Sequence, residues 1–453
     1  MSGRLAARAF MGLVALVFAI SACNGSTATP TTTVTVGPGA PTTAPTPTPT
    51  PTAAPIITLK VAAWTWTEPK GAAISKTWLD AFQAQHPNIR IQQVAVPYAS
   101  YDTTIATQLG TSAAPDVVQL SAVGFGQAVA GKALAPLDSL IDNSAFASSL
   151  LPQNDFAVFG GSRYAYIWSL AVFGMFYNKN MLAAAGLPVP TTFDQFMATA
   201  KALTDKSKGQ YGFAMRSTLA EASGWFPQFS MWVLGHGAHY TNGDQVTINT
   251  PEMKQAVTDY IAMYKSGSML TGTDAATYRR AFAAGKIGMT FDNGLGTQMA
   301  SLPTLKDLAW AAPTPFNGGT QLILPIYLGI SATSQNKEAA AELVKFWLSQ
   351  GVQDQLAVDL QGELPATFNW DKPSAAYSAY LKTAYWVGPL ESKVAAAQPA
   401  VPAGPLSVLA PQIQQAILNG LSKVQAGQTT VDQMLIDAQA QVEAAKAALP
   451  KGS

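Results

Sequence analysis

The chain has 453 residues, in which 27 Lys and Arg nearly balance 26 Asp and Glu. The net charge of +1, with no long run of one sign, excludes the basic face through which nucleic-acid-binding proteins attract their ligand. A single cysteine excludes an internal disulfide, so the fold must depend on its apolar core.

The N-terminal segment predicts an export signal that ends at Cys23. Arg4 and Arg8 precede the 12-residue apolar run AFMGLVALVFAI. That run is too short for a membrane-spanning helix, which needs about 20 residues, but it has the length of a signal-peptide core. The run leads into Ile-Ser-Ala-Cys, which resembles the bacterial lipobox, in which the cysteine is lipidated and becomes the first mature residue. We therefore expect residues 1–22 to be a lipoprotein signal peptide, and lipidated Cys23 to attach the protein to the extracytoplasmic face of the cell membrane.

Residues 23–55 predict a disordered spacer behind that cysteine. Pro and Thr dominate residues 26–55, which contain no charged and no aromatic residue. Such a segment buries too little apolar surface to offset its conformational entropy, and proline favours an extended chain. A glycosylated stalk is the alternative interpretation.

The remaining body, from residue 56 onward, exceeds the size at which a single core stops growing, so at least two lobes are expected. Its first part alternates strand and helix patterns, which predicts a parallel sheet covered by helices. The expected elements are a strand in 56–64, a helix in 71–85, a strand in 89–97, and a helix followed by a strand in 100–120.

Helix-end signals mark the later elements. Thr192 and Gln195 form a capping box for a helix in 192–205, and Thr430 and Gln433 do the same for the last helix, which Pro450 ends. We expect a strand and short helix in 174–188, and an amphipathic helix in 336–351 that Gly351 closes.

Unusual side chains follow several predicted strands, and ligands of open α/β sheets bind beyond the carboxyl ends of their strands. Trp64, Trp66 and Glu68 follow the first strand, Asp116 and Gln119 lie on the third, and Asp292 and Asn293 end a later one.

The body resembles the family 1 extracellular solute-binding proteins of ABC importers, the group that includes maltose-, trehalose- and glycerol-phosphate-type binders. Segments such as LDAFQAQHPNIRIQ, APDVVQL, FYNKNMLAAAGLPVPTTFDQFMATAKAL, FAAGKIGMTFDNG and GELPATFN carry the resemblance and run in family order. It implies a two-lobe α/β fold of the type II periplasmic-binding-protein kind, with a ligand cleft between lobes that close by hinge bending. The implied first lobe takes residues 56–165 plus 290–333, and the second takes 166–289 plus 334–453. A monomer that delivers a carbohydrate to the importer's permease, without catalytic residues, cofactor or metal, is the implied function.

A sugar site needs aromatic walls for the ring faces and acid or amide groups for the hydroxyls. Trp225, in SGWFPQF, is the strongest single aromatic by the resemblance, while Asp116 has the alternative role of capping local backbone. The full set of expected ligand-binding residues is Trp64, Trp66, Glu68, Tyr98, Asp116, Gln119, Trp168, Trp225, Asp292, Asn293, Tyr327, Glu363 and Trp386.

Two other functions remain open at this stage. The same fold could bind a polyamine or a glycerol phosphate. A lipid-anchored glycoside hydrolase or lyase would need two carboxylates about 5–9.5 Å apart, for which Glu68, Asp116 and Asp292 are candidates. The spacing of His236 and His239 in HGAH suits a metal on a helix, but the glycine between them and the absence of a nearby cysteine or acid argue against it.

Overall fold

In the computed structural model, residues 1–53 and the body, Ala54–Ser453, form separate units. The structure describes residues 55–142, 149–295, 305, 308–312, 320–360, 363–365, 374–401 and 406–449. The predicted signal peptide, Cys23 and the linker therefore lie outside the described residues.

The first lobe is built on a six-stranded sheet with the order β15-β6-β14-β3-β1-β2. Strands β2 and β3 run parallel to β1, as the sequence predicts, but β14 runs antiparallel to both β3 and β6. The predicted parallel arrangement is confirmed for these first three strands, and the sheet becomes mixed where β14 enters it on return from the second lobe. The strands are β1 (Ile57–Ala63), β2 (Ile89–Ala95), β3 (Val117–Leu120), β6 (Ala165–Val172), β14 (Ile323–Ile330) and β15 (Glu363–Pro365), with β4 (Val158–Phe159) and β5 (Ser162–Arg163) as a separate hairpin. The accompanying helices are α1 (Pro69–Gln85), α2 (Tyr98–Gln108), α3 (Ala122–Ala130), α11 (Lys337–Trp347), α12 (Gln350–Leu360) and α13 (Ala375–Leu381). Helix α14 (Val387–Glu391) packs instead against β13 of the second sheet.

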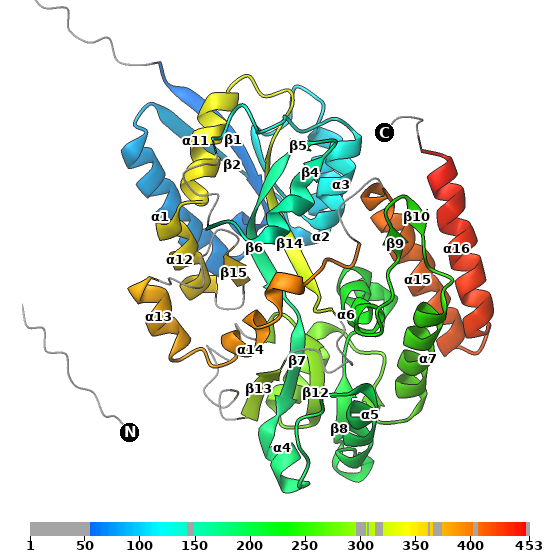
Figure 1. Cartoon of the computed structure of the whole chain (residues 1–453). Coiled ribbons are helices and arrows are strands. Elements are labelled where there is room, and N and C mark those ends of the chain that lie inside the picture. The colour runs from blue at the N-terminus through cyan, green and yellow to red at the C-terminus, as the bar shows by residue number, and fades with distance from the viewer. Residues whose placement is uncertain are drawn as a thin grey trace, which may run out of the picture. The chain divides into compact units, whose positions relative to one another are not determined.

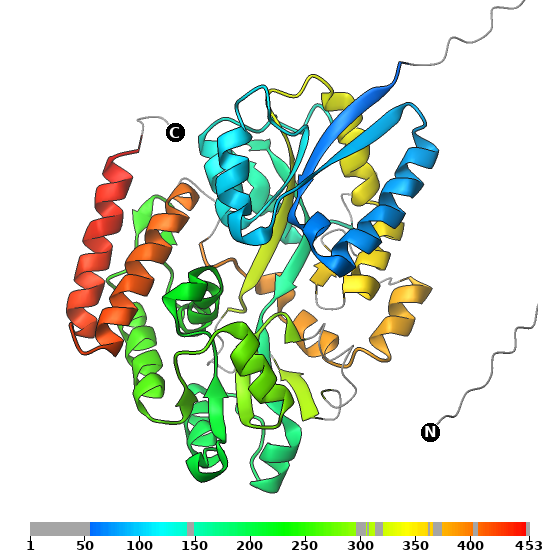
Figure 2. The same cartoon turned by 180° about the vertical axis from the view of Figure 1, so that it is seen from behind.

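The second lobe contains a five-stranded sheet with the order β11-β8-β12-β7-β13. Helices α15 and α16 pack against each other and against α6 and α7 on the outer side of this lobe (Figures 1 and 2). The sheet strands are β7 (Gly174–Asn178), β8 (Tyr211–Ala214), β11 (Met269–Leu270), β12 (Ile287–Asp292) and β13 (Ala309–Ala312), and β9 (Thr241–Asn242) pairs with β10 (Gln245–Val246). The helices are α4 (Lys179–Ala184), α5 (Phe193–Ala202), α6 (Ala222–Gly235), α7 (Pro251–Lys265), α8 (Ala275–Ala283), α15 (Ala410–Gln425) and α16 (Val431–Ala447).

Three chain segments cross between the lobes side by side. Strand β6 continues into β7 through Phe173, whose backbone N–H donates to Leu322 O at 3.0 Å. Ile323 N and Gln398 O, 3.0 Å apart, join the second crossing to the third. The Gln321 side chain adds a bond from Nε2 to Phe173 O at 2.7 Å. This hydrogen-bonded strip connects the two lobes.

The segments of the chain that make up each lobe differ from those expected. Strands β12 and β13 pair in the second sheet, whereas residues 290–333 were expected in the first lobe. Helix α11 packs on β1 and β14, and α12 packs on β15, so both lie on the first sheet, whereas 334–453 was expected wholly in the second lobe. The physical reason is that strand periodicity reports burial but not which sheet a strand joins.

The sequence predicted the N-caps of these helices more accurately than it predicted helix ends or lobe boundaries. Thr192 Oγ1 accepts from Gln195 N, and Thr430 Oγ1 accepts from Gln433 N, so both predicted N-caps are confirmed. The helix expected to end at Gly351 instead ends at Trp347, and α12 begins three residues later. Gln353 Nε2 donates to Trp347 O at 2.9 Å, which satisfies a carbonyl at that helix end without a glycine. None of the helices in the described part of the body has the length and apolarity that a membrane crossing requires.

Candidate ligand-binding site

A short 3-10 turn, Trp64–Thr67, follows β1 and separates its two tryptophans. Trp66 turns back into the first lobe, where its Nε1 donates to Val61 O at 3.1 Å. Trp64 instead packs edge-to-face against Tyr98, with ring centroids 5.5 Å apart, and against Tyr101 at 5.0 Å. Trp64 is therefore the buried support of an aromatic group in which Tyr98 is the outer ring.

Tyr98 begins α2 and is the exposed ring of this aromatic group. Its side chain is 51 % exposed, yet desolvation raises its pKa, with a further increase from Asp102, a decrease from Arg216 and an increase from Glu68. Glu68 is also exposed, and desolvation raises the pKa of its carboxyl. Arg216 follows β8 in the second lobe, so a charge of that lobe acts on this tyrosine of the first lobe.

Arg216 follows β8 and is fixed within the second lobe. Its Nε donates to Glu221 Oε2 at 2.8 Å, and the same oxygen accepts from Ala275 N at 2.9 Å. The side chain crosses Gly224 so closely that a Cβ there would lie 2.4 Å from Arg216 Nε. The arginine side chain is 14 % exposed. Within the described residues, hydrogen bonds hold Nε but neither terminal nitrogen of its guanidinium.

Asp292 ends β12 and is engaged by its own lobe. Its carboxylate accepts from Arg279 Nε at 2.8 Å and Nη2 at 2.6 Å, from the Tyr278 hydroxyl, and from Gly294 N at 2.7 Å. Burial alone would raise the pKa of Asp292, but the charge and hydrogen bonds of Arg279 reverse this and lower it. Asp292 is fully buried, so it stabilises the second lobe and leaves Asn293, which is half-buried, as the more accessible neighbour.

The acid and amide of β3 also have local partners. Asp116 Oδ2 accepts from Lys60 N at 2.9 Å, and Oδ1 accepts from Ser334 Oγ at 2.5 Å. This geometry matches the alternative in which Asp116 caps local backbone. Gln119 is 1 % exposed, and its Oε1 accepts from Thr65 Oγ1 at 3.4 Å.

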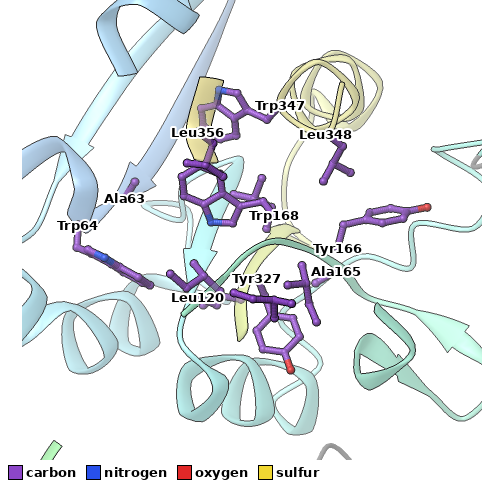
Figure 3. Close-up of a cluster of buried hydrophobic side chains, with 14 of the residues drawn as sticks. Ala63, Trp64, Leu120, Ala165, Tyr166, Trp168, Tyr327, Trp347, Leu348 and Leu356 are labelled. Atoms are coloured by element: carbon purple, nitrogen blue, oxygen red, sulfur yellow. The ribbon is translucent and has the colours of Figure 1, made fainter. Parts of the chain in front are cut away.

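Figure 3 shows Trp168 and Trp347 close to each other in the buried cluster of the first lobe. Trp66 and Trp168 line a small space with Trp78, Trp347 and Gln119. Its volume of about 10 Å³ is room for about one water molecule, and far too small for a sugar ring. In this conformation these tryptophans form the first-lobe core.

The other expected aromatics are also buried. Trp225, the strongest candidate by sequence, has no exposed surface, and its Nε1 donates to Tyr260 Oη at 3.1 Å within the second-lobe core. Tyr327 stacks on Phe125 with ring centroids 4.3 Å apart, and Trp386 is 2 % exposed. Glu363 pairs through its backbone with Ala171 at the sheet edge, and its side chain lies outside the described part of the chain.

Of the expected residues, the structure brings Trp64 and Tyr98 into contact, and Glu68 directly follows the turn that carries Trp64. Sequence reasoning missed Arg216 of the second lobe, whose charge acts on Tyr98. The available signal was the polar Arg-Ser-Thr that follows YGFAM, the segment that contains β8.

The His236 ring lies between two polar neighbours of its own lobe. His236 Nδ1 lies 2.8 Å from Trp232 O, and Nε2 lies 2.8 Å from Asp259 Oδ2. Among the residues that the structure describes, no group of three or more His, Cys, Asp or Glu side chains could hold a metal ion.

Two sheets joined by paired crossing strands, with polar and aromatic walls at the strand ends, define a two-lobe binding protein. The family model for bacterial extracellular solute-binding proteins matches residues 64–354, and the chain belongs to this family.

Sequence relatives agree with that membership. The chain is 26 % identical over 294 residues to YcjN of Escherichia coli strain K12, whose name places it with an ABC transporter as a periplasmic-binding protein. It is 27 % identical over 223 residues to the diacetylchitobiose binding protein DasA of Streptomyces coelicolor. The matches cover 62 % and 45 % of this chain, and span 66 % of YcjN and 49 % of DasA.

Solved structures share the fold at lower sequence identity. The cyclic α-maltosyl-1,6-maltose binding protein of Arthrobacter globiformis has a TM-score of 0.73 at 20 % identity, covering 86 % of this chain and 99 % of that one. Lmo0181 of Listeria monocytogenes, solved in complex with cycloalternan, has a TM-score of 0.72 at 22 % identity with the same coverage.

Proposed function

We propose that this protein captures a carbohydrate outside the cell and delivers it to the permease of an ABC importer, with no catalytic step. The observation that carries the proposal is the half-exposed Tyr98 ring, which packs on Trp64 of the first lobe and whose pKa is affected by the charges of Glu68 and of Arg216 from the second lobe. A ring face for stacking, beside a carboxylate acceptor and a guanidinium donor, is the chemistry that sugar rings and hydroxyls require. The relatives named for diacetylchitobiose, cycloalternan and maltosyl-maltose support the same ligand class.

The alternatives have less support. A polyamine cation would meet the guanidinium of Arg216, while Asp292 and Asp116, two of the acids that suggested it, are held by Arg279 and by Lys60 and Ser334. The same engagement argues against a pair of catalytic carboxylates drawn from Glu68, Asp116 and Asp292. A phosphate ester would require a cation that is not already matched, whereas Arg216 and Arg279 each have a carboxylate partner.

We further propose that Cys23 carries the lipid anchor, that residues 26–55 act as the spacer, and that the body works as a monomer on the extracytoplasmic face. This arrangement rests on the lipobox and the Pro/Thr-rich composition. It would keep the binding body within reach of a membrane permease.

A ligand screen tests the proposal. The purified protein is tested by thermal shift and calorimetry against maltotriose, cellotriose, diacetylchitobiose, spermidine and glycerol 3-phosphate, and each sugar is analysed by chromatography after incubation. We expect at least one sugar to bind and to be recovered intact. Binding confined to spermidine or glycerol phosphate, or cleavage of a bound sugar, would refute the carbohydrate-capture function.

A further inference from the structure

One buried glutamine is bonded to all three of the chain segments that cross between the lobes (Figure 1). Gln321 lies in the second crossing, just before β14, and is 2 % exposed. Its Nε2 donates to Phe173 O of the first crossing at 2.7 Å, and to Leu390 O at the start of the third crossing at 3.4 Å. Its backbone O accepts from Gln398 N, further along the third crossing, at 3.0 Å. A single residue of the middle segment therefore binds both of its neighbours.

The two carbonyl oxygens that accept from the Gln321 side chain depend on it. Among the described residues, the hydrogen bonds accepted by Phe173 O and by Leu390 O both come from Gln321 Nε2. Phe173 is 1 % exposed and Leu390 is 5 % exposed, so water cannot readily replace the amide. A buried carbonyl left without a donor is costly, so loss of this side chain would destabilise the first and third crossings together.

The first and third crossings also touch directly beside this amide. Leu390 lies on α14, which packs against β13 of the second sheet. Gly174 begins β7 immediately after Phe173, and a Cβ at Gly174 would lie 2.1 Å from Leu390 Cδ2. The absence of a side chain at Gly174 is therefore what allows Leu390 to pack on the first crossing, within reach of Gln321.

We infer that Gln321 is a positioning residue for ligand capture: its side chain fixes the three crossings to one another and so determines the pivot about which the lobes close, without touching the ligand. This inference rests on the proposed function. Each lobe carries part of the site, so the parts meet only if the segments between the lobes keep fixed places. Without the bonds from Gln321, the lobes would sample more arrangements, and the apparent affinity would fall with the fraction that is competent to bind.

The test uses two independent changes at the crossings in the full-length protein, purified in detergent. Gln321→Met keeps the length of the side chain but removes both of its donated bonds. Gly174→Ala leaves Gln321 chemically intact but displaces Leu390 from the first crossing, because the added Cβ would lie 2.1 Å from Leu390 Cδ2.

Each change has a matched control elsewhere in the fold. Gln353→Met removes a bond of the same kind, from Nε2 of a fully buried glutamine to Trp347 O at 2.9 Å, but within the first lobe. In Gln321 and Gln353 alike, Oε1 has no hydrogen-bond partner among the described residues. Gly388→Ala adds a Cβ on α14 itself, at a glycine with no atom within 4 Å of the new group.

Two measurements distinguish a positioning role from a purely structural one. In hydrogen exchange followed by mass spectrometry, we expect the peptides that contain Phe173, Ile323 and Gln398 to exchange about tenfold faster in both crossing variants, and as in wild type in both controls. In calorimetry against maltotriose, cellotriose and diacetylchitobiose, the sugar that wild type binds best should bind the crossing variants about 3- to 30-fold more weakly, and the controls within about twofold. Circular dichroism melts check that each variant is folded, and a purely structural loss would lower the melting temperatures of Gln321→Met and Gln353→Met without changing affinity.

The outcomes separate the inference from the proposed function. If wild-type protein binds none of the sugars, the proposed function fails, and hydrogen exchange still decides whether Gln321 holds the crossings together. If wild type binds a sugar and folded Gln321→Met binds it as tightly as Gln353→Met does, the inference alone is overturned. Crossing peptides that exchange no faster in Gln321→Met than in Gln353→Met would also overturn it, and Gly174→Ala decides both points if Gln321→Met does not fold.

Discussion

The ion pair between Arg279 and Asp292 should make a large contribution to the stability of the second lobe. The Asp292 side chain has no exposed surface and that of Arg279 is 19 % exposed, so Arg279→Met would leave a carboxylate buried without its counterion. Breaking such a pair costs about 3–5 kcal/mol of unfolding free energy. The matched control is Lys76→Met in the Lys76–Asp80 pair, whose side chains are 74 % and 60 % exposed and which should lose about 0–1 kcal/mol.

Urea denaturation followed by tryptophan fluorescence measures both variants. Because Arg279 lowers the pKa of Asp292 below the ordinary value of 3.8, the pair stabilises the folded protein above that pH, and its contribution is lost as the pH falls through the folded-state pKa. In Arg279→Met the isolated carboxyl can take up a proton instead. The difference between wild type and Arg279→Met should therefore narrow from pH 7 to pH 4. An Arg279→Met protein no less stable than Lys76→Met at pH 7 would refute the assignment of Asp292 as a structural rather than a ligand-binding acid.

Three further predictions concern other parts of the chain. Trp225→Phe removes the hydrogen bond to Tyr260 and should lower the unfolding free energy by about 1–2 kcal/mol, while the sugar affinity measured by calorimetry stays unchanged. A large loss of affinity would instead identify Trp225 as a ligand-binding residue. Burial lowers the pKa of His236, but the hydrogen bonds to Asp259 and to the helix carbonyl of Trp232 raise it above 6.5 overall. The His236–Asp259 pair therefore stabilises the folded protein most at low pH, and this stabilisation is lost as the pH rises through the folded-state pKa. The melting temperature of His236→Gln, compared with wild type, should show a deficit near pH 6 that shrinks toward pH 9, and a deficit independent of pH would contradict this. Cys23→Ala should move the protein from the membrane fraction to the soluble fraction, and continued membrane retention would count against a lipid anchor.

The sequence predicted local structure well because its signals are local. A hydroxyl at Thr192 and an amide at Gln195 lie close in the chain, and the cap they predict needs no knowledge of the rest of the fold. The crossing at Phe173 gave no such signal. It lies inside a continuous buried run from β6 to β7, where a change of sheet leaves the apolar pattern unaltered.

The sequence predicted only part of the candidate site, because residue type and strand position do not show which side chains the fold buries. Residue type and strand position identified Trp64 and Tyr98, which the structure brings into contact, and Glu68, which directly follows the turn that carries Trp64. The same criteria chose Trp225, but an indole that closes a core and an indole that faces a ligand look alike in sequence. Arg216 was missed because its role depends on Glu221 and Gly224, and neither partner is recognisable before the turn after β8 is built.

The placement of these groups also explains how ligand could close the lobes. Arg216 is held by residues of the second lobe, and Tyr98 is supported by Trp64 of the first, so each wall is ordered without the other. The crossing strip at Phe173, Gln321 and Gln398 is the shared connection. A ligand shifts such an equilibrium only by the difference between its affinities for the closed and open forms. A sugar that contacts only one lobe binds the open and closed forms equally and does not shift the equilibrium between them. A sugar that contacts both lobes in the closed form shifts the equilibrium toward it by the free energy of the additional contacts. Residues of the second lobe that contact the ligand only in the closed form are therefore expected to govern closure as well as affinity.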